Sequence, residues 1–184
     1  MALMKTVILK RTISVAAKEG FNQFSVRSVA QECGCSEGLI FHHFSTKKNL
    51  LEVCYRCIID DVNDAIRSEI DGKRDLQSVF YSFCGFMRRN REAALFCLGY
   101  YKNNDGVMDG LEVIKGSIRD MFPGYDDDVV SSMTKEAAVI GCLYGAGVIV
   151  WDKGREEDYR RFVIELIGGG GSPEQGLINN CTVS

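Results

Sequence analysis

Residues 24–51 read FSVRSVAQECGCSEGLIFHHFSTKKNLL, and this stretch decides the fold of the N-terminal part of the chain. It holds two short helical patterns that meet at a tight turn around Gly34. Ser25 and Ser36 stand where the two helices begin, and their hydroxyls can accept hydrogen bonds from backbone N–H groups that a first helical turn leaves unpaired. Gly34 suits a turn residue with a positive φ angle. Together these features predict a helix-turn-helix.

Apolar residues recur at helical spacing in both patterns. They are Val26, Val29, Ala30 and Cys33 in the first helix, and Leu39, Ile40, Phe41 and Phe44 in the second. A preceding helix is predicted from about Lys5 to Glu19, with Gly20 after its end. Phe21 and Phe24 are expected to anchor the following loop to a three-helix core.

The same stretch resembles the TetR family of transcriptional regulators. The resemblance lies in a small-residue turn, a Ser-x-Gly helix start, an aromatic and histidine run, a Thr-Lys pair and a pair of leucines. These positions are Ser36, Gly38, Phe41, His42, His43, Phe44, Thr46, Lys47, Leu50 and Leu51. The upstream segment AAKEGFNQFSVRSVAQECG matches in order and spacing, so the resemblance covers roughly the first third of the chain. It implies an all-α protein with an N-terminal three-helix DNA-binding head and a larger helical body for ligand binding and dimerisation.

The resemblance also implies which side chains meet DNA. The helix over residues 37–44 would enter the major groove and present Glu37, Gly38, Leu39 and His42 to base edges. The implied phosphate contacts are Ser25, Arg27, Ser36, His43 and Lys47. Two positions depart from the family, because Phe41 stands where a tyrosine is usual and Glu37 where a basic or neutral residue is usual.

Charge is divided unevenly along the chain. Residues 1–50 carry seven Lys or Arg and three Glu, which gives a net charge of 7 − 3 = +4. The whole chain has a net charge of −3, so residues 51–184 together carry −7. Phosphate affinity depends on local positive charge. The division therefore favours a DNA-binding head on an acidic body, although an imbalance of this size also arises by chance.

Helical patterns continue through most of the body. They predict helices over about residues 46–69, 76–89, 92–102, 107–121, 126–152 and 155–167, with a break at Gly72. The stretch GGGGSP at residues 168–173 is a flexible break. We therefore predict three parts: a head over residues 1–49, a body over 50–168 and a tail over 169–184.

Residues 137–151, AAVIGCLYGAGVIVW, are apolar around nearly the whole helix circumference. Such a helix needs burial on more than one side. The resemblance implies a dimer interface here, formed by Ile140, Gly141, Tyr144, Gly145, Val148 and Trp151. The alternative is a central core helix within one chain.

A ligand pocket is expected among the aromatic residues of the middle region, which suit a small and mostly apolar ligand. The candidates are Phe80, Phe83, Met87, Phe96, Tyr100 and Tyr101. Ordinary core packing is the competing interpretation of each of these residues.

Eight cysteines allow two further hypotheses. Cys33, Cys35, Cys54 and Cys57 have a spacing that could form a zinc site, and Cys54 with Cys57 could form a redox sensor. The simpler interpretation is reduced, mostly buried thiols.

No phosphate-binding glycine loop, HExxH motif or nucleophile elbow occurs, and both histidines lie in the DNA motif, so we expect no enzyme and no cofactor. No apolar run approaches the ~20 residues that span a bilayer. The N-terminus lacks a signal-peptide pattern, so we expect a cytoplasmic protein. The combined prediction is a ligand-responsive regulator, most often a repressor in this family, that binds a palindromic operator as a homodimer.

Overall fold

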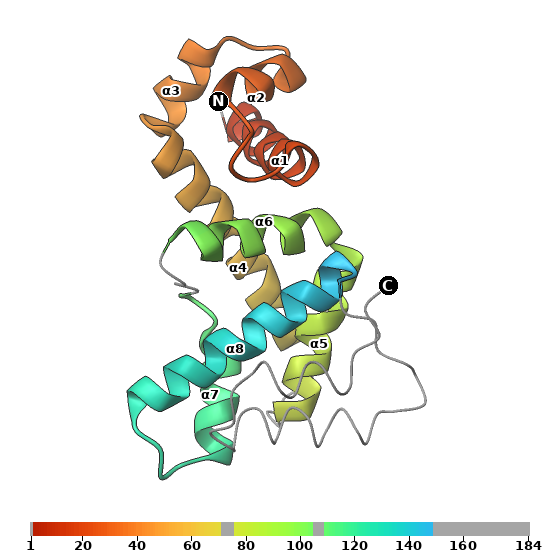
Figure 1. Cartoon of the computed structure of the whole chain (residues 1–184), viewed down its shortest axis with the longest axis vertical. Coiled ribbons are helices and arrows are strands. Elements are labelled where there is room, and N and C mark those ends of the chain that lie inside the picture. Colours follow the sequence, from red (N-terminus) through yellow and green to blue (C-terminus); the bar gives the residue numbers. More distant parts are fainter. Residues whose placement is uncertain (1, 71–75, 105–108, 149–184) are drawn as a thin grey trace.

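The computed structural model describes residues 2–70, 76–104 and 109–148 (Figure 1). Within these residues the chain forms eight helices and no strand, which confirms the predicted all-α class. The helices are α1 (Ala2–Glu19), α2 (Val26–Cys33), α3 (Glu37–Phe44), α4 (Lys47–Glu69), α5 (Leu76–Arg89), α6 (Arg91–Asn103), α7 (Glu112–Met121) and α8 (Asp127–Ala146). None of these helices is both long and apolar enough to cross a membrane.

The head consists of α1, α2 and α3, which gather at one end of the molecule (Figure 1). Its core is formed by Ile8, Val15, Ala16, Phe24, Val29, Ile40 and Phe44. Of the apolar residues of α3, Phe41 is 41% exposed and Leu39 is only partly buried. An eight-residue helix that lies on a small core buries one face only, and Ile40 with Phe44 occupies that face.

The helix α4 joins the head to the body. Thr46 caps it by accepting a hydrogen bond from the Asn49 backbone N–H at 3.0 Å. Its buried face starts at Leu50 and continues through Cys54, Ile58, Val62 and Ile66, whereas Leu51 is only partly buried. The predicted boundary between residues 49 and 50 therefore falls inside one continuous helix.

The body packs α4, α5, α6 and α7 with α8 across α5 and α6 (Figure 1). Two glycines of α8 explain the close approach to α5. A Cβ on Gly141 would lie 2.2 Å from the Phe83 ring, and a Cβ on Gly145 would lie 2.6 Å from the Met87 backbone. The close contact that the sequence assigned to a second copy is therefore made within the chain, because α5 occupies this glycine face.

Helix ends in the body differ from the expected ones. The helix α7 begins at Glu112, whereas the sequence predicted a start at Val107, which lies outside the described residues. The helix α8 ends at Ala146 and not near residue 152, because Gly147 adopts a left-handed φ of 78° and its N–H bonds back to Leu143 and Tyr144. The predicted helix over 155–167, the tail, Gly72 and Trp151 all lie outside the described residues.

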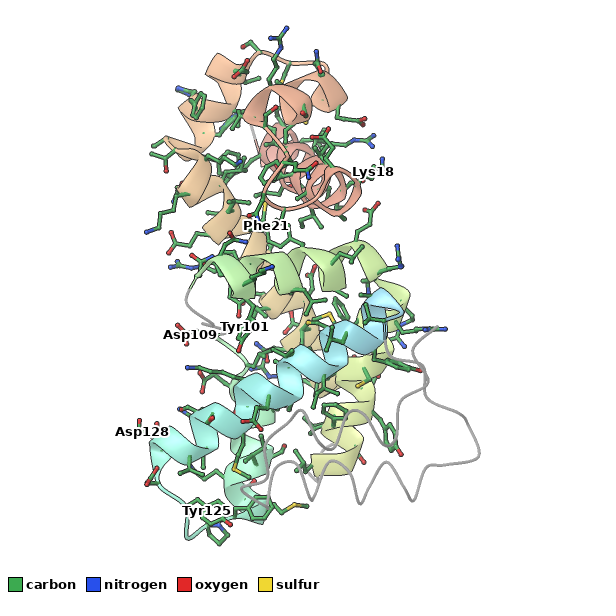
Figure 2. All side chains as sticks on the ribbon, viewed as in Figure 1. Lys18, Phe21, Tyr101, Asp109, Tyr125 and Asp128 are labelled. Carbon is green, nitrogen blue, oxygen red and sulfur yellow. The ribbon has the colours of Figure 1, made fainter. Side chains whose placement is uncertain are left out.

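The head rests on α6 through α1 and the loop after it (Figure 2). The Phe21 ring lies 5.3 Å from the ring of Phe96 and 6.4 Å from that of Tyr100. A Cβ on Gly99 would lie 2.4 Å from the Phe21 Cβ, so α6 approaches this loop closely only because residue 99 is glycine. Phe21 thus makes an apolar contact between the head and the body.

Candidate nucleic-acid interface

The turn between α2 and α3 is built from short-range hydrogen bonds. The Ser25 hydroxyl accepts from the Ser28 N–H at 3.0 Å and caps α2. Gly34 has a φ of 63°, and the Cys35 N–H donates to the Ala30 carbonyl at 3.0 Å. These bonds close the end of α2 and turn the chain directly into α3, as predicted.

The first turn of α3 faces away from the head core. The Ser36 hydroxyl accepts from the Leu39 N–H at 3.2 Å. Glu37 and Gly38 are exposed, and a Cβ on Gly38 would meet only the Ser36 Oγ, at 3.8 Å. The chain's own packing therefore does not require a glycine at position 38. This leaves the backbone of the first turn open to close approach by a partner.

The other side of α3 is held firmly. Ile40 and Phe44 are each 1% exposed and belong to the core. His42 is exposed and His43 partly buried, with their rings 5.6 Å apart, so both histidines lie at the surface that α3 offers. Because the buried face is fixed, the direction of the exposed face follows from packing and not from a mobile loop.

Strain marks the connection between α3 and α4. Ser45 has a φ of 58° and a ψ of −46°, and it is the one non-glycine residue with positive φ in the described residues. The Thr46 N–H donates to the Phe44 carbonyl at 2.6 Å, which closes a γ-turn of the uncommon positive-φ kind. This turn sets the angle between α3 and the following helix α4.

Lys47 has a role that the sequence did not predict. Its ammonium group donates to the Phe24 carbonyl at 2.8 Å and lies 4.1 Å from the centroid of the Phe24 ring. Lys47 is only partly exposed, whereas its neighbour Lys48 is exposed. The ammonium of Lys47 thus ties the start of α4 to the loop before α2, which makes it a structural group as well as a candidate phosphate contact.

Exposed cations surround the head. They are Lys5, Lys10, Arg11, Lys18, Arg27 and Lys48, against the exposed acids Glu19, Glu32 and Glu37. Lys5 lies 5.6 Å from the centroid of the Phe44 ring and so brings α1 charge to the side of α3. The positive balance of the head is therefore present at its surface, where it attracts polyanions.

The candidate pocket residues are mostly core. Phe80, Phe83, Met87 and Phe96 are at most 1% exposed, and Phe83 and Met87 fill the space at the α8 glycines. Tyr101 is partly exposed and outside both described cavities. Tyr100 alone among the six lines one of them. Large apolar side chains pack against one another when no polar group holds a cavity open, so this set of aromatics formed a core.

The two described cavities have polar walls. The larger, of ≈ 430 Å³, lies between α4 and α5 beside Glu69 and Arg89. There Glu69 is already bonded, to Ser82 at 2.7 Å and to Arg89 at 2.6 Å. The smaller, of ≈ 280 Å³, lies between α4, the end of α6 and residues 109–110. Sequence reasoning missed both because it searched for apolar residues only.

The cysteine hypotheses gain no support. Among the described residues no group of three His, Cys, Asp or Glu side chains is placed to hold a metal ion. Burial raises the pKa of Cys54, whose thiol donates to the Leu9 carbonyl at 3.7 Å. Burial and then the Asp60 and Asp61 carboxylates raise the pKa of Cys57. A raised pKa disfavours the thiolate that reacts with oxidants or metals.

Of the predicted dimer residues, Ile140, Gly141 and Gly145 are buried within the chain. Tyr144 is partly buried, with the Arg88 guanidinium 5.3 Å from its ring centroid. Val148 is 51% exposed. The predicted face is therefore divided: its Ile140 and glycine positions are covered within the chain, whereas Tyr144 and Val148 keep exposed surface.

Comparison with known proteins places the head in a family. Residues 8–54 match the family described as bacterial regulatory proteins, tetR family. The regulator BetI 2 of Chromohalobacter salexigens is 34% identical over 59 residues, which are 32% of this chain and 28% of that protein. YerO of Bacillus subtilis, an uncharacterised HTH-type transcriptional regulator, is 40% identical over 47 residues, 26% of this chain and 16% of its own. The matched residues thus span less than a third of either relative.

Solved structures share the fold over nearly the whole chain. A tetR family transcription regulator from Shewanella sp. PV-4 has a TM-score of 0.69 at 18% identity and covers 89% of this chain and 95% of its own. A tetR family protein from Rhodococcus RHA1 has a TM-score of 0.58 at 17% identity, covering 97% and 98%. The family match contains the whole helix-turn-helix, so the head is similar to the TetR family of helix-turn-helix transcriptional regulators, and the body shares the fold of the two solved structures.

Proposed function

We propose that the protein binds a palindromic DNA operator as a homodimer and represses transcription until a small ligand binds its body. The observation that carries this proposal is the exposed first turn of α3, with Glu37 and Gly38 outward, on a helix whose opposite face is buried through Ile40 and Phe44. A helix of this kind fits the major groove, where bases are distinguishable. Such a role on chromosomal DNA would place the protein in the cytoplasm.

In this proposal the surface of α3 divides into two kinds of contact. Glu37, Gly38, Leu39 and His42 meet base edges, with Leu39 suited to a thymine methyl and Glu37 to a cytosine amino group. Ser25, Arg27, Ser36 and His43 meet phosphates, the two serines together with the backbone N–H groups of their helix starts. Lys47 contributes positive charge nearby and holds the start of α4 through Phe24.

Dimerisation is proposed through α8, on the face that the helices of the described residues leave exposed or only partly buried. Val129, Val139 and Leu143 lie along one side of α8 at helical spacing, and each is exposed or only partly buried. A two-fold axis here would pair the two heads for an inverted repeat. This replaces the glycine face as the proposed interface.

Ligand response is proposed to act through the junction between the head and the body. A ligand in the body would act by changing how α1 and the loop after it pack on α6. A ligand shifts this equilibrium only if it binds the two arrangements with different affinity.

The test is selection of bound duplexes from random DNA, followed by titration at several salt concentrations. We expect an inverted repeat and a log–log salt slope of about −0.9 for each phosphate contact. Sedimentation at micromolar concentration measures the dimer independently. Selection of no palindrome would refute the operator proposal, and a monomer would refute the dimer proposal.

A further inference from the structure

The smaller cavity lies between α4, the end of α6 and residues 109–110. It measures ≈ 280 Å³, close to the lower end of the ~300–1,000 Å³ typical of small-molecule pockets. Its chemistry is set by Glu52, Tyr55, Arg56, Asp60, Tyr100 and Asp109. Asp109 lies beside the end of α6, near Tyr101 (Figure 2). A cavity of this size admits a small ligand only.

Two stacked tyrosines form the aromatic part of its wall. The rings of Tyr55 and Tyr100 are 4.3 Å apart and 5° from parallel. The Tyr55 hydroxyl donates to the Asp109 carbonyl at 2.8 Å, so the stack is held in place from both helices and from the residue 109 backbone. Aromatic faces attract cations, more strongly when water is partly excluded.

The net charge of the cavity wall also favours a cation. Three carboxylates, Glu52, Asp60 and Asp109, face one guanidinium, Arg56, which gives −3 + 1 = −2. Arg56 lies 3.4 Å from Glu52, but its side chain is 72% exposed, so it neutralises the wall only weakly. Burial and then the Glu52 carboxylate raise the pKa of Tyr100, while Arg56 acts in the opposite direction.

A buried acceptor lies next to this wall. Asn63 is 7% exposed, and its Nδ2 donates to the Gly110 carbonyl at 2.8 Å. Among the described residues its Oδ1 has no hydrogen-bond partner. Gly110, which lines the cavity, is held at a φ of 90°. The Asn63 amide therefore fixes the Gly110 backbone in the cavity wall.

We propose that this cavity binds a small organic cation with an aromatic or apolar body, seated against the tyrosine stack and the carboxylates. The regulatory consequence of this binding rests on the proposed function, but the binding itself does not. Tyr100 lines the cavity and also contacts Phe21, which joins the head to α6. A cation that moved Tyr100 would therefore change the surface on which the head rests.

The experiment titrates the intact protein with phenyltrimethylammonium and with its neutral isostere tert-butylbenzene, followed by saturation-transfer NMR. We expect saturable binding of the cation, tighter than that of the isostere. Glu52→Gln should weaken cation binding about two- to fivefold, as loss of one exposed charge interaction does. Arg56→Gln should strengthen it by a similar factor, and neither change should affect tert-butylbenzene.

Asp120→Asn is the matched control, because it removes the same charge from an exposed position on α7 outside the cavity. Equal binding of the two probes, no saturable cation binding, or charge variants without effect would each overturn the proposal. Operator titration in parallel separates the two ideas. Operator binding without cation binding would reject this site alone, and cation binding without operator binding would reject the proposed function.

Discussion

Gly38 in α3 and Gly145 in α8 are both helical glycines that the sequence marks as points of close approach, but their surroundings are opposite. A Cβ on Gly38 would meet only the Ser36 Oγ at 3.8 Å, whereas a Cβ on Gly145 would lie 2.6 Å from three atoms of Met87, two of them backbone. Gly38 in the head is therefore open to a partner outside the chain, whereas Gly145 in the body packs against α5 of the same chain. A glycine in a helix predicts that another segment packs closely against it, but it does not show whether that segment belongs to the same chain or to a partner.

The largest effect is expected at the body glycine. Gly145→Ala should lower the free energy of unfolding by about 1–3 kcal/mol or more, because α5 and α8 must separate to admit the methyl group. Urea unfolding followed by circular dichroism measures this. Gly116→Ala is the control: nothing lies within 4 Å of its Cβ in α7, so helix propensity should stabilise the protein by roughly 0.5–1 kcal/mol.

If Gly145→Ala unfolded at the same urea concentration as the wild type, α8 would not pack on α5 as described. The dimer proposal would then return to the glycine face. A charge at this position, as in Gly145→Glu, should disrupt the body itself and not only an interface between copies.

The second largest effect is expected at the contact between the head and α6. Gly99→Ala should cost about 1–2 kcal/mol, because the new methyl group would displace Phe21, whose Cβ and Cγ would lie only 2.4 and 2.5 Å from it. The cost is smaller than at Gly145 because a loop side chain moves more easily than a helix backbone. Hydrogen exchange of residues 20–24 should increase along with it.

Gly85→Ala provides the comparison within α5. Its Cβ would meet only the end of the Arg89 side chain, at 3.2 Å, and that end can move. We expect little change in stability and no change in exchange at residues 20–24. Equal effects of the Gly85 and Gly99 changes would show that Phe21 does not hold the head on α6.

Sequence predicted the head well because its structure is made by near neighbours. Ser25, Ser36 and Thr46 cap helices through N–H groups three residues further along, and Gly34 closes its turn with carbonyls three and four residues back. Such bonds follow from local spacing. The family resemblance in the same stretch added the roles of the exposed residues.

The remaining features depend on residues that lie far apart in sequence. Lys47 bonds to Phe24, 23 positions earlier, and Tyr55 bonds to Asp109, 54 positions later. Periodicity marks a residue as buried or exposed but does not name its partner. The polar cavity was missed for this reason. Phe80, Phe83 and Phe96 were predicted to line a ligand pocket, but they are buried in the core of the body.

A smaller effect should separate two adjacent lysines. Lys47→Ala should lower the free energy of unfolding by about 1 kcal/mol, because it removes a hydrogen bond and a cation–π contact with Phe24. Lys48→Ala, at an exposed position, should stay within about 0.5 kcal/mol of the wild type. Urea unfolding of both variants checks the difference.

Both lysine variants should weaken binding to all duplexes without changing base preference, since phosphate contacts carry no sequence information. A Lys47→Ala protein of wild-type stability would contradict the structural role. A changed base preference would contradict the assignment of this position to the backbone side of the interface.

Gly38→Ala should change the free energy of unfolding only slightly, and with the opposite sign to Lys47→Ala. The added methyl group meets nothing closer than 3.8 Å, and alanine favours a helix over glycine, so the protein should gain roughly 0.5–1 kcal/mol of stability.

On DNA the same methyl group would stand between the α3 backbone and the base edges. A poor contact there costs about 1–3 kcal/mol, so affinity for the selected operator should fall roughly fivefold to a hundredfold, while non-specific duplex binds as before. Anisotropy titrations at fixed salt, beside urea unfolding of the same sample, measure both quantities. A more stable protein with a weaker operator complex would show that Gly38 serves the partner and not the fold. Unchanged operator affinity would instead move the base contacts away from the first turn of α3.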